Sequence, residues 1–346
     1  MPSAAPARAL VALSGGVDSS VAALIAQHGG MQVTSVTLAL PGADLTCAHL
    51  VAQRLSIEHR VVSAEAILER EVIGPFLDEY ERGRTPNPCV LCNPNVKFRV
   101  LLEWADRLGC ERVITGHYAQ IQPGNGEFHL LKGVDARKDQ SYVLYRLTQE
   151  MLARASFPVG GLTKRQVREK AAAAGLPTAE RAASQDICFV TDGDTAGFIR
   201  ARRPQAMRPG PIVDRDGVVV GGHAGLGAYT VGQRRGLGIG GPEGPCYVLE
   251  MRPEDNTLVV GAEEELWAEQ CTLDEVHLVG SPPGDKFEAE VMTRYRGMST
   301  PAEIQLAGDR AVVSFQRPHR APAPGQAAVF YQGERLIGGG TIRSVE

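Results

Sequence analysis

Three cysteines of the chain stand in settings that suit sulfur chemistry. Cys89 and Cys92 form a Cys-Val-Leu-Cys segment, and Cys188 lies much further along, within Ser-Gln-Asp-Ile-Cys-Phe. A single Cys-x-x-Cys most often belongs to a zinc site or to a redox pair. The sequence holds no second such pair and no group of histidines that would complete four zinc ligands, so it favours reactive thiols over structural zinc.

The surroundings of the first two cysteines are expected to make them reactive. Pro86, Pro88 and Pro94 predict a rigid loop here rather than a helix or strand. A helix is expected to begin at Lys97, and its positive end, with Lys97 and Arg84 nearby, would lower a thiol pKa. The other four cysteines are expected to be small buried residues: Cys47, Cys110, Cys246 and Cys271.

A second chemical feature is the segment 14–20, Ser-Gly-Gly-Val-Asp-Ser-Ser, which directly follows a short apolar run. Glycines let the backbone turn tightly and present N–H groups to an anion. The helix expected next adds the positive end of its dipole, and three serines add hydroxyl donors. No lysine is present, so this is not the loop that ends in Gly-Lys-Ser/Thr. The segment predicts a phosphate cradle of another kind.

Alternating strands and helices are expected to hold these residues in place. The apolar run 9–13 reads as a buried parallel strand, and the helix 66–81 is expected to be interrupted at Pro75. Further strands are expected at 33–40, 59–62 and 112–115, and further helices at 19–28, 45–55 and 97–108. Repeated units of this kind predict an α/β fold with a doubly wound parallel sheet. A hairpin is expected at 123–126, and Thr163 with Gln166 predicts a capping box.

The character of the sequence changes near Pro204, after which short strands, glycines and prolines dominate. Residues 253–256 read as a hairpin turn. Strands recur toward the end and predict a small antiparallel β-barrel: 287–295, 302–306, 311–315, 327–331 and 339–342. We therefore expect a catalytic domain over 1–200, a small central domain over 201–265 and a barrel over 266–346.

Composition narrows the class of protein. The formal net charge is -4 and the pI about 6.1, which by itself argues against a nucleic-acid binder. Basic residues are nevertheless concentrated in four segments, so the net charge alone does not exclude nucleic-acid binding: 82–99, 200–208, 234–235 and 317–320. No apolar run approaches the ~20 residues that span a membrane, and no signal peptide is evident. We expect a cytoplasmic protein without a membrane partner and without a disulfide framework.

Taken together, these segments resemble known families. Residues 14–20 resemble the loop of ATP pyrophosphatases, which cleave ATP between the α and β phosphates. The chain as a whole resembles the tRNA-specific 2-thiouridylases, and the matching stretches run through almost its whole length: 14–20, 83–93 with 97–98, 115–119, 138–142, 157–158, 184–189, 229–238 and 294–296. The resemblance implies that ATP adenylates the C2 oxygen of the wobble uridine in tRNAs for lysine, glutamate and glutamine, and that sulfur then displaces AMP.

The resemblance also implies roles for individual residues. Contacts to ATP are implied for Ala12, Leu13, Ser14, Gly15, Gly16, Val17, Asp18, Ser19, Leu38 and Gly116, with Asp18 also helping to hold Mg²⁺. Contacts to tRNA are implied for Asn87, Pro88, Cys89, His117, Lys138, Asp139, Gln140, Arg294, Tyr295 and Gln326. The target base would be splayed from its loop into a pocket, as in other enzymes that act on bases.

Two routes are open for the sulfur. In one, Cys188 carries a persulfide from a donor protein, and Cys92 resolves the product, leaving a Cys92–Cys188 disulfide. In the other, Cys89, Cys92 and Cys188 ligate a [4Fe–4S] cluster whose open iron carries sulfide. Many relatives have aspartate at position 89, and the cysteine of this chain supplies a third thiolate. We therefore favour the cluster.

A second departure and two rival functions complete the prediction. The segment 40–44 is shorter than in relatives and lacks their Met and Trp, which weakens the role implied for Leu38. A small-molecule ATP pyrophosphatase would share the phosphate loop but would leave the cysteines unexplained. A non-catalytic nucleotide-binding or RNA-binding module would leave the intact loop unexplained.

Overall fold

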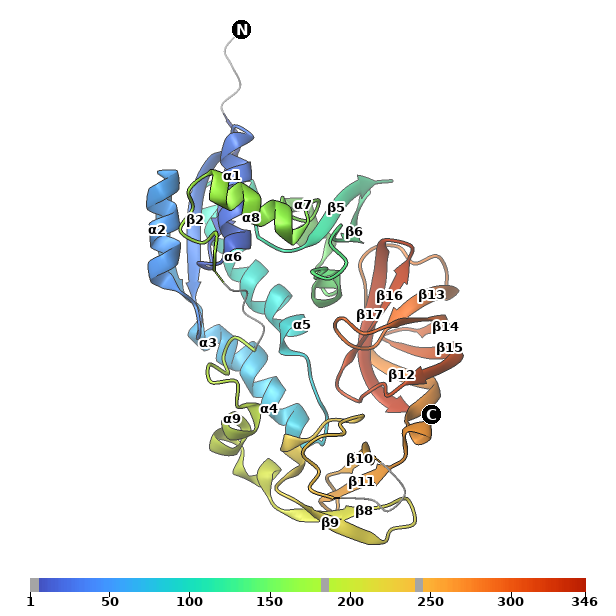
Figure 1. The fold of residues 1–346 in the computed structure, drawn as a ribbon. Coiled ribbons are helices and arrows are strands. Elements are labelled where there is room, and N and C mark those ends of the chain that lie inside the picture. The colour runs from blue at the N-terminus through green and yellow to red at the C-terminus, as the bar shows by residue number, and fades with distance from the viewer. Residues whose placement is uncertain (1–5, 182–186, 240–244) are drawn as a thin grey trace.

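The computed structural model describes residues 6–181, 187–239 and 245–346, and its elements form three units along the chain (Figure 1). The first unit is built on five parallel strands in the order β3-β2-β1-β4-β7. These are β1 (Arg8–Ala12), β2 (Gln32–Ala39), β3 (Glu58–Ser63), β4 (Arg112–Ile114) and β7 (Ala155–Ser156). The predicted doubly wound α/β class is confirmed.

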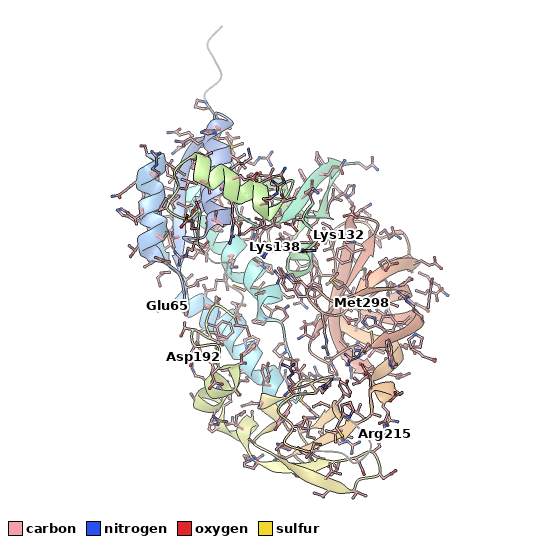
Figure 2. All side chains as sticks on the ribbon, viewed as in Figure 1. Glu65, Lys132, Lys138, Asp192, Arg215 and Met298 are labelled. Carbon is pink, nitrogen blue, oxygen red and sulfur yellow. The ribbon has the colours of Figure 1, made fainter. Side chains whose placement is uncertain are left out.

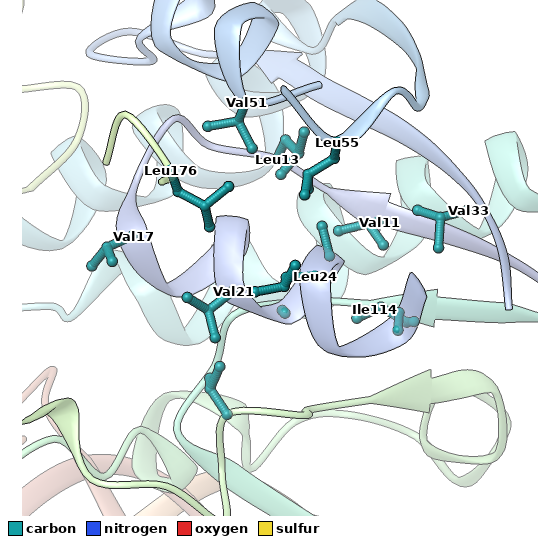
Figure 3. Close-up of a cluster of buried hydrophobic side chains, with 14 of the residues drawn as sticks. Val11, Leu13, Val17, Val21, Leu24, Val33, Val51, Leu55, Ile114 and Leu176 are labelled. Carbon is teal, nitrogen blue, oxygen red and sulfur yellow. The ribbon is translucent and has the colours of Figure 1, made fainter. Parts of the chain in front are cut away.

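Helices cover both faces of this sheet because β1 is apolar on both sides. Val11 packs with Val21 and Val51 beneath the helices of one face (Figure 3). Leu10 packs with Leu101 on the other face. Burying each such side chain contributes roughly 1.5–3 kcal/mol. One face carries α1 (Val17–His28), α2 (Leu45–Leu55) and α8 (Lys164–Ala173), and the other carries α6 (Arg99–Arg107).

Two helical segments differ from expectation. The interruption expected at Pro75 is wrong, because α3 (Glu65–Leu68), the π-helical turn η1 (Glu69–Ile73) and α4 (Gly74–Glu81) follow without a gap. The rigid loop expected around Cys89 and Cys92 is also wrong. Helix α5 (Pro88–Cys92), a second π-helical turn η2 (Asn93–Phe98) and α6 are continuous. Pro88 sits in the first turn after the extended Asn87, where a helix needs no N–H donor. Pro75 lies just after η1 and Pro94 lies in η2, so each interior proline lies in or beside a π-helical turn.

A hairpin then reaches out of the first unit. Strands β5 (Ala119–Gly124) and β6 (Glu127–Lys132) form the hairpin predicted at 123–126. Leu130 and Leu131 pair with strand β17 (Arg335–Val345) of the third unit, so the two units share one sheet. The helical elements η3 (Ser141–Leu144) and α7 (Gln149–Arg154) follow. The capping box predicted at Thr163 opens α8.

The second unit is a small four-stranded sheet in the order β10-β11-β8-β9. The hairpin predicted at 253–256 joins two of its strands. The strands are β8 (Gly210–Val213), β9 (Val219–His223), β10 (Tyr247–Arg252) and β11 (Thr257–Gly261). Helical elements flank them: α9 (Thr195–Arg202), η4 (Pro204–Met207), η5 (Leu226–Ala228) and η6 (Glu263–Leu266).

The third unit is the predicted antiparallel barrel. Strand β12 pairs with both β15 and β17, which closes the sheet on itself. Its other strands are β13 (Lys286–Met292), β14 (Ser299–Ala307), β15 (Arg310–Arg320) and β16 (Ala327–Gln332), beside β12 (Trp267–Leu278). In the described part of the chain, no helix is both long enough and apolar enough to cross a membrane.

Candidate functional site

The phosphate loop lies between the end of β1 and the start of α1, at the carboxyl edge of the parallel sheet. Gly15 has φ +76°, and a Cβ there would lie 2.6 Å from the carbonyl oxygen of Asp44, so only glycine fits. The Ser20 hydroxyl donates to the Gly16 carbonyl at 2.8 Å, and the hydroxyls of Ser14 and Ser19 lie 3.1 Å apart. The loop is thus held open toward the N-terminus of α1, which suits an anion.

The residues implied for ATP binding differ in where their side chains lie. Leu13 and Val17 are buried in the core beneath α1, so only their backbones can take part. Ala12 and Leu38 pack on the opposite face of the sheet, with the α6 cluster. The serines, the glycines and Asp18 carry the polar groups of the loop.

Asp18 is held by two residues that sequence reasoning missed. The Lys164 ammonium donates to both carboxylate oxygens, at 2.6 and 2.7 Å, and the Tyr118 hydroxyl donates to Oδ1 at 2.7 Å. The Lys164 side chain is 13% exposed, so this ion pair is well shielded. Lys164 is the first residue of α8, directly after the capping Thr163. The capping box predicted where α8 begins, but it did not indicate that the side chain of Lys164 contacts Asp18.

Gly116 presses against the same loop. A Cβ on Gly116 would lie 2.5 Å from the backbone nitrogen of Ser19 and 2.7 Å from the carbonyl carbon of Asp18. Both neighbours are backbone atoms in the first turn of α1 and cannot move aside singly. Gly116 therefore supports the phosphate loop by close approach.

We expect Gly116→Ala to weaken binding of Mg-ATP about tenfold or more and to destabilise the fold by roughly 1–3 kcal/mol, because the added methyl displaces the loop. Isothermal titration and thermal unfolding measure the two effects. Gly161→Ala is the matched control, since a Cβ there meets nothing within 4 Å. Equal nucleotide affinity in the two variants would contradict the role of Gly116.

The cysteine segments meet the phosphate loop through the turn after β2. Asp44 lies against Gly15, and a Cβ on Gly42 would lie 2.8 Å from the carbonyl oxygen of Cys188. Cys92 is buried in one cluster with Phe189, the neighbour of Cys188. The loop, the turn and both cysteine segments thus form one continuous wall. Ser184, Gln185 and Asp186 of the matching stretch lie outside the described residues.

The thiols differ in burial and in charge. Cys92 is buried, Cys89 is half-buried and Cys188 is exposed. Burial raises the pKa of Cys92 to about 11 although Lys97 acts against it. The expected lowering of the thiol pKa is therefore wrong for Cys92, because desolvation of the thiolate outweighs the lysine.

Lys97 and His117 lie beside these thiols. Burial alone would lower the pKa of Lys97, but the thiolates of Cys92, Cys89 and Cys188 raise it above its usual value. Burial and then Lys97 lower the pKa of His117 to about 3, and its Nδ1 lies 2.7 Å from the Thr115 hydroxyl. His117 is therefore a neutral imidazole at physiological pH, and Lys97 is the cation of the thiol pocket.

We expect alkylation of Cys92 by iodoacetamide to rise about tenfold per pH unit from pH 7 to pH 10, because only the thiolate reacts. With a pKa of about 11, about one Cys92 in a thousand is ionised at pH 8. Site-resolved mass spectrometry measures the rate, with exposed Cys188 as the faster internal reference. A plateau below pH 9 would show that the pocket stabilises the thiolate instead.

The arrangement of the described side chains bears on metal binding. Within residues 6–181, 187–239 and 245–346, no group of three His, Cys, Asp or Glu is close enough to hold a metal ion. The three cysteines thus do not form a ready-made cluster site. Asp18 fits Mg²⁺ better, because Mg²⁺ is commonly held by one or two carboxylates together with substrate phosphates.

Residues implied for tRNA contact lie where the first unit meets the barrel. The side-chain amide of Gln326 donates to the Thr85 carbonyl at 2.7 Å, which ties the barrel to the segment before α5. The Asn87 side chain accepts the N–H of Cys89 at 3.1 Å and caps α5, where Pro88 is buried. A cleft of about 550 Å³ opens between α4–α5 and the barrel, and Asn87 lines it.

A second group gathers around the β5–β6 hairpin and the β13–β14 loop. Lys138 follows the hairpin in the chain, and Met298 lies in the β13–β14 loop of the barrel (Figure 2). Tyr295 packs against the cluster that Cys89 also contacts, and it carries Arg296 over its ring at 5.0 Å. Asp139 accepts the N–H of Gly133, and the side-chain oxygen of Gln140 accepts the N–H of Tyr118.

Arg294 differs from the rest of this group. Its guanidinium donates to the carbonyls of Val231 and Ala321, at 2.6 and 2.9 Å, and burial lowers its pKa. It therefore fastens the central domain to the barrel. Its buried Nε has no hydrogen-bond partner in the described structure.

Comparison with known proteins agrees with this arrangement. Three family models match: a tRNA methyl transferase HUP domain over residues 7–192, a tRNA methyl transferase PRC-barrel domain over 196–262 and an aminomethyltransferase β-barrel domain over 268–342. The tRNA-specific 2-thiouridylase MnmA of Chloroflexus aggregans is 46% identical over 98% of this chain and 99% of its own length. That of Desulforudis audaxviator is 47% identical over 96% and 97%.

A solved 4-thiouridine synthetase in complex with RNA and ATP is 19% identical, covers 57% of this chain and 51% of its own, and has a TM-score of 0.35. That likeness is too slight to carry an argument. The near-full-length relatives are decisive, because their identity extends over all three units. The chain belongs to the tRNA-specific 2-thiouridylase family.

Proposed function

We propose that this protein uses ATP to replace the C2 oxygen of the wobble uridine in tRNA by sulfur. The observation that carries the proposal is the shared wall of the site. The turn after β2 touches Gly15 of the phosphate loop on one side and Cys188 on the other. An adenylated base bound there would face a sulfur carrier without leaving the pocket.

The first step belongs to the phosphate loop. The loop and the N-terminus of α1 bind the phosphates of ATP, and Asp18 would hold Mg²⁺, which neutralises charge on the phosphates. The C2 oxygen of the uracil attacks the α phosphorus, and pyrophosphate leaves. The implied base contacts at Asn87, Pro88 and Cys89 sit at the start of α5, beside the cleft. The chain's own work here is to bind, orient and exclude water.

The second step belongs to the cysteines. The Cys188 thiolate attacks the terminal sulfur of a persulfide on a donor protein, whose own cysteine leaves as a thiolate. The terminal sulfur of the resulting Cys188 persulfide then attacks C2, and AMP leaves. Cys92 then attacks the Cys188 sulfur, which releases 2-thiouridine and leaves a Cys92–Cys188 disulfide for reduction by an external thiol. The exposure of Cys188 suits a residue loaded from outside, and the burial of Cys92 suits one that acts last.

The cluster form of the mechanism stays a prediction with its own test. We expect Cys89→Asp to keep activity within about tenfold if thiol exchange operates, because Cys89 takes no part in that exchange. Loss of activity together with about four iron atoms per wild-type chain, purified without oxygen, would instead establish the cluster.

The function is tested with ATP, unmodified tRNA and sulfide or a persulfide donor. We expect 2-thiouridine in tRNAs for lysine, glutamate and glutamine, and pyrophosphate release that requires tRNA. ATP turnover that ignores tRNA would favour the rival small-molecule ATP pyrophosphatase. The proposed place of action is the cytoplasm.

A further inference from the structure

The geometry points to Tyr118 as a positioning residue that couples the phosphate loop to the tRNA-contact segment 138–140. The inference rests on the proposed function and extends it. It says how nucleotide binding at the phosphate loop affects tRNA binding at residues 138–140. Tyr118 is 2% exposed and lies between the two halves. Its side chain bonds to one of them and its backbone to the other.

The side chain bonds to the nucleotide half. The Tyr118 hydroxyl donates to Asp18 Oδ1 at 2.7 Å, and the same oxygen accepts Lys164 at 2.6 Å. A metal ion or phosphate bound at Asp18 competes with both donors for this oxygen. Binding of Mg-ATP therefore changes the position or the partner of the Tyr118 hydroxyl, and the buried ring must follow it.

The backbone bonds to the tRNA half. The Tyr118 carbonyl accepts the N–H of Gln140 at 2.8 Å, and the Tyr118 N–H donates to the Gln140 side-chain oxygen at 3.0 Å. A Cβ on Gly133 would lie 2.8 Å from the Tyr118 carbonyl oxygen, so the backbone is confined on that side as well. Movement of Tyr118 is therefore passed directly to Gln140.

The connection continues into the barrel. Asp139 accepts the N–H groups of Gly133 and Ser141 and the Ser141 hydroxyl, at 2.8, 3.2 and 2.8 Å. The Ser141 hydroxyl lies 3.1 Å from that of Tyr331 in β16. These hydrogen bonds, together with the peptide link between Asp139 and Gln140, thus join the phosphate loop to the barrel face. Coupling through such a path is reciprocal: tRNA tightens nucleotide binding by the factor by which nucleotide tightens tRNA binding.

The test measures that factor. Affinity for α,β-methylene ATP with Mg²⁺ is determined by titration with and without saturating unmodified tRNA whose anticodon begins with uridine. We expect wild type to bind the nucleotide at least about fivefold more tightly with tRNA. Tyr118→Phe is expected to reduce the factor below about twofold, while the backbone bonds to Gln140 remain. Loss of packing alone would not change this ratio.

Tyr142→Phe is the matched control, since Tyr142 is equally buried and its hydroxyl donates to the Ala327 carbonyl at 2.8 Å. It should lose similar stability and keep the wild-type factor. If Tyr118→Phe does not fold, Gln140→Met removes the side-chain bond between Gln140 and the Tyr118 N–H and keeps only the main-chain bond. The coupling factor is then expected to fall as well, and a general loss of tRNA affinity cancels in the ratio. Wild type that binds neither ligand would refute the proposed function. Binding without coupling, or coupling kept in the Tyr118 or Gln140 variant, would overturn only this inference.

Discussion

Serine in place of Cys188 is expected to lower the rate of tRNA thiolation by about three orders of magnitude or more, a size typical of removing a covalent nucleophile. Pyrophosphate release should persist, because adenylation of the uracil uses the phosphate loop and not the thiol. Formation of 2-thiouridine is measured by nucleoside mass spectrometry, and pyrophosphate is measured in a single turnover with unmodified tRNA. The divergence of the two signals is the informative result.

Cys92→Ser separates the two cysteine roles within the same prediction. Its chemistry comes after sulfur has reached C2, so the variant should trap tRNA joined to Cys188 through a disulfide that dithiothreitol releases. Cys246→Ser is the control, because Cys246 packs in the central domain and should leave the rate within about twofold. If the Cys188 variant thiolated tRNA at the wild-type rate, Cys188 would not be the residue that carries the sulfur.

The parts of this molecule that the sequence predicted are those determined by local patterns. The apolar run before residue 14 is buried on both faces as β1, and the capping box at Thr163 begins α8. Turn residues likewise located the hairpins at 123–126 and 253–256. Such features depend on neighbours in sequence, so they can be recognised without coordinates.

The parts that could not be predicted depend on contacts between distant residues. Nothing near Lys164 in the sequence indicates that its ammonium meets Asp18, since that meeting depends on how α8 crosses α1. The thiol pKa was misjudged for the same reason. Arg84 and Lys97 are visible in sequence, whereas the burial of Cys92 by Phe189 and its neighbours is tertiary. The prediction of a loop from Pro88 and Pro94 was wrong because the effect of a proline depends on its position within a helix.

Asparagine in place of Asp18 is expected to reduce tRNA-dependent pyrophosphate release by about two to three orders of magnitude, a loss comparable to removing one preorganised transition-state contact. The amide keeps the shape of the side chain but loses the charge that Mg²⁺ prefers. It also leaves the shielded Lys164 ammonium without its carboxylate, so that cation is expected to bind the ATP phosphates in an unproductive position. Rates are measured with and without saturating Mg²⁺.

Affinity for tRNA distinguishes a lost nucleotide site from a damaged fold. The Asp18→Asn protein should bind unmodified tRNA within about threefold of wild type, because no implied tRNA contact is removed. Asp106→Asn is the matched control: it also breaks one ion pair, with Arg154 at 2.6 Å, but on the protein surface, where such a pair contributes about 0–1 kcal/mol. Equal pyrophosphate release by the two variants would mean that the carboxylate serves only the fold. A deficit confined to Asp18→Asn would instead place the metal-dependent step at the first turn of α1.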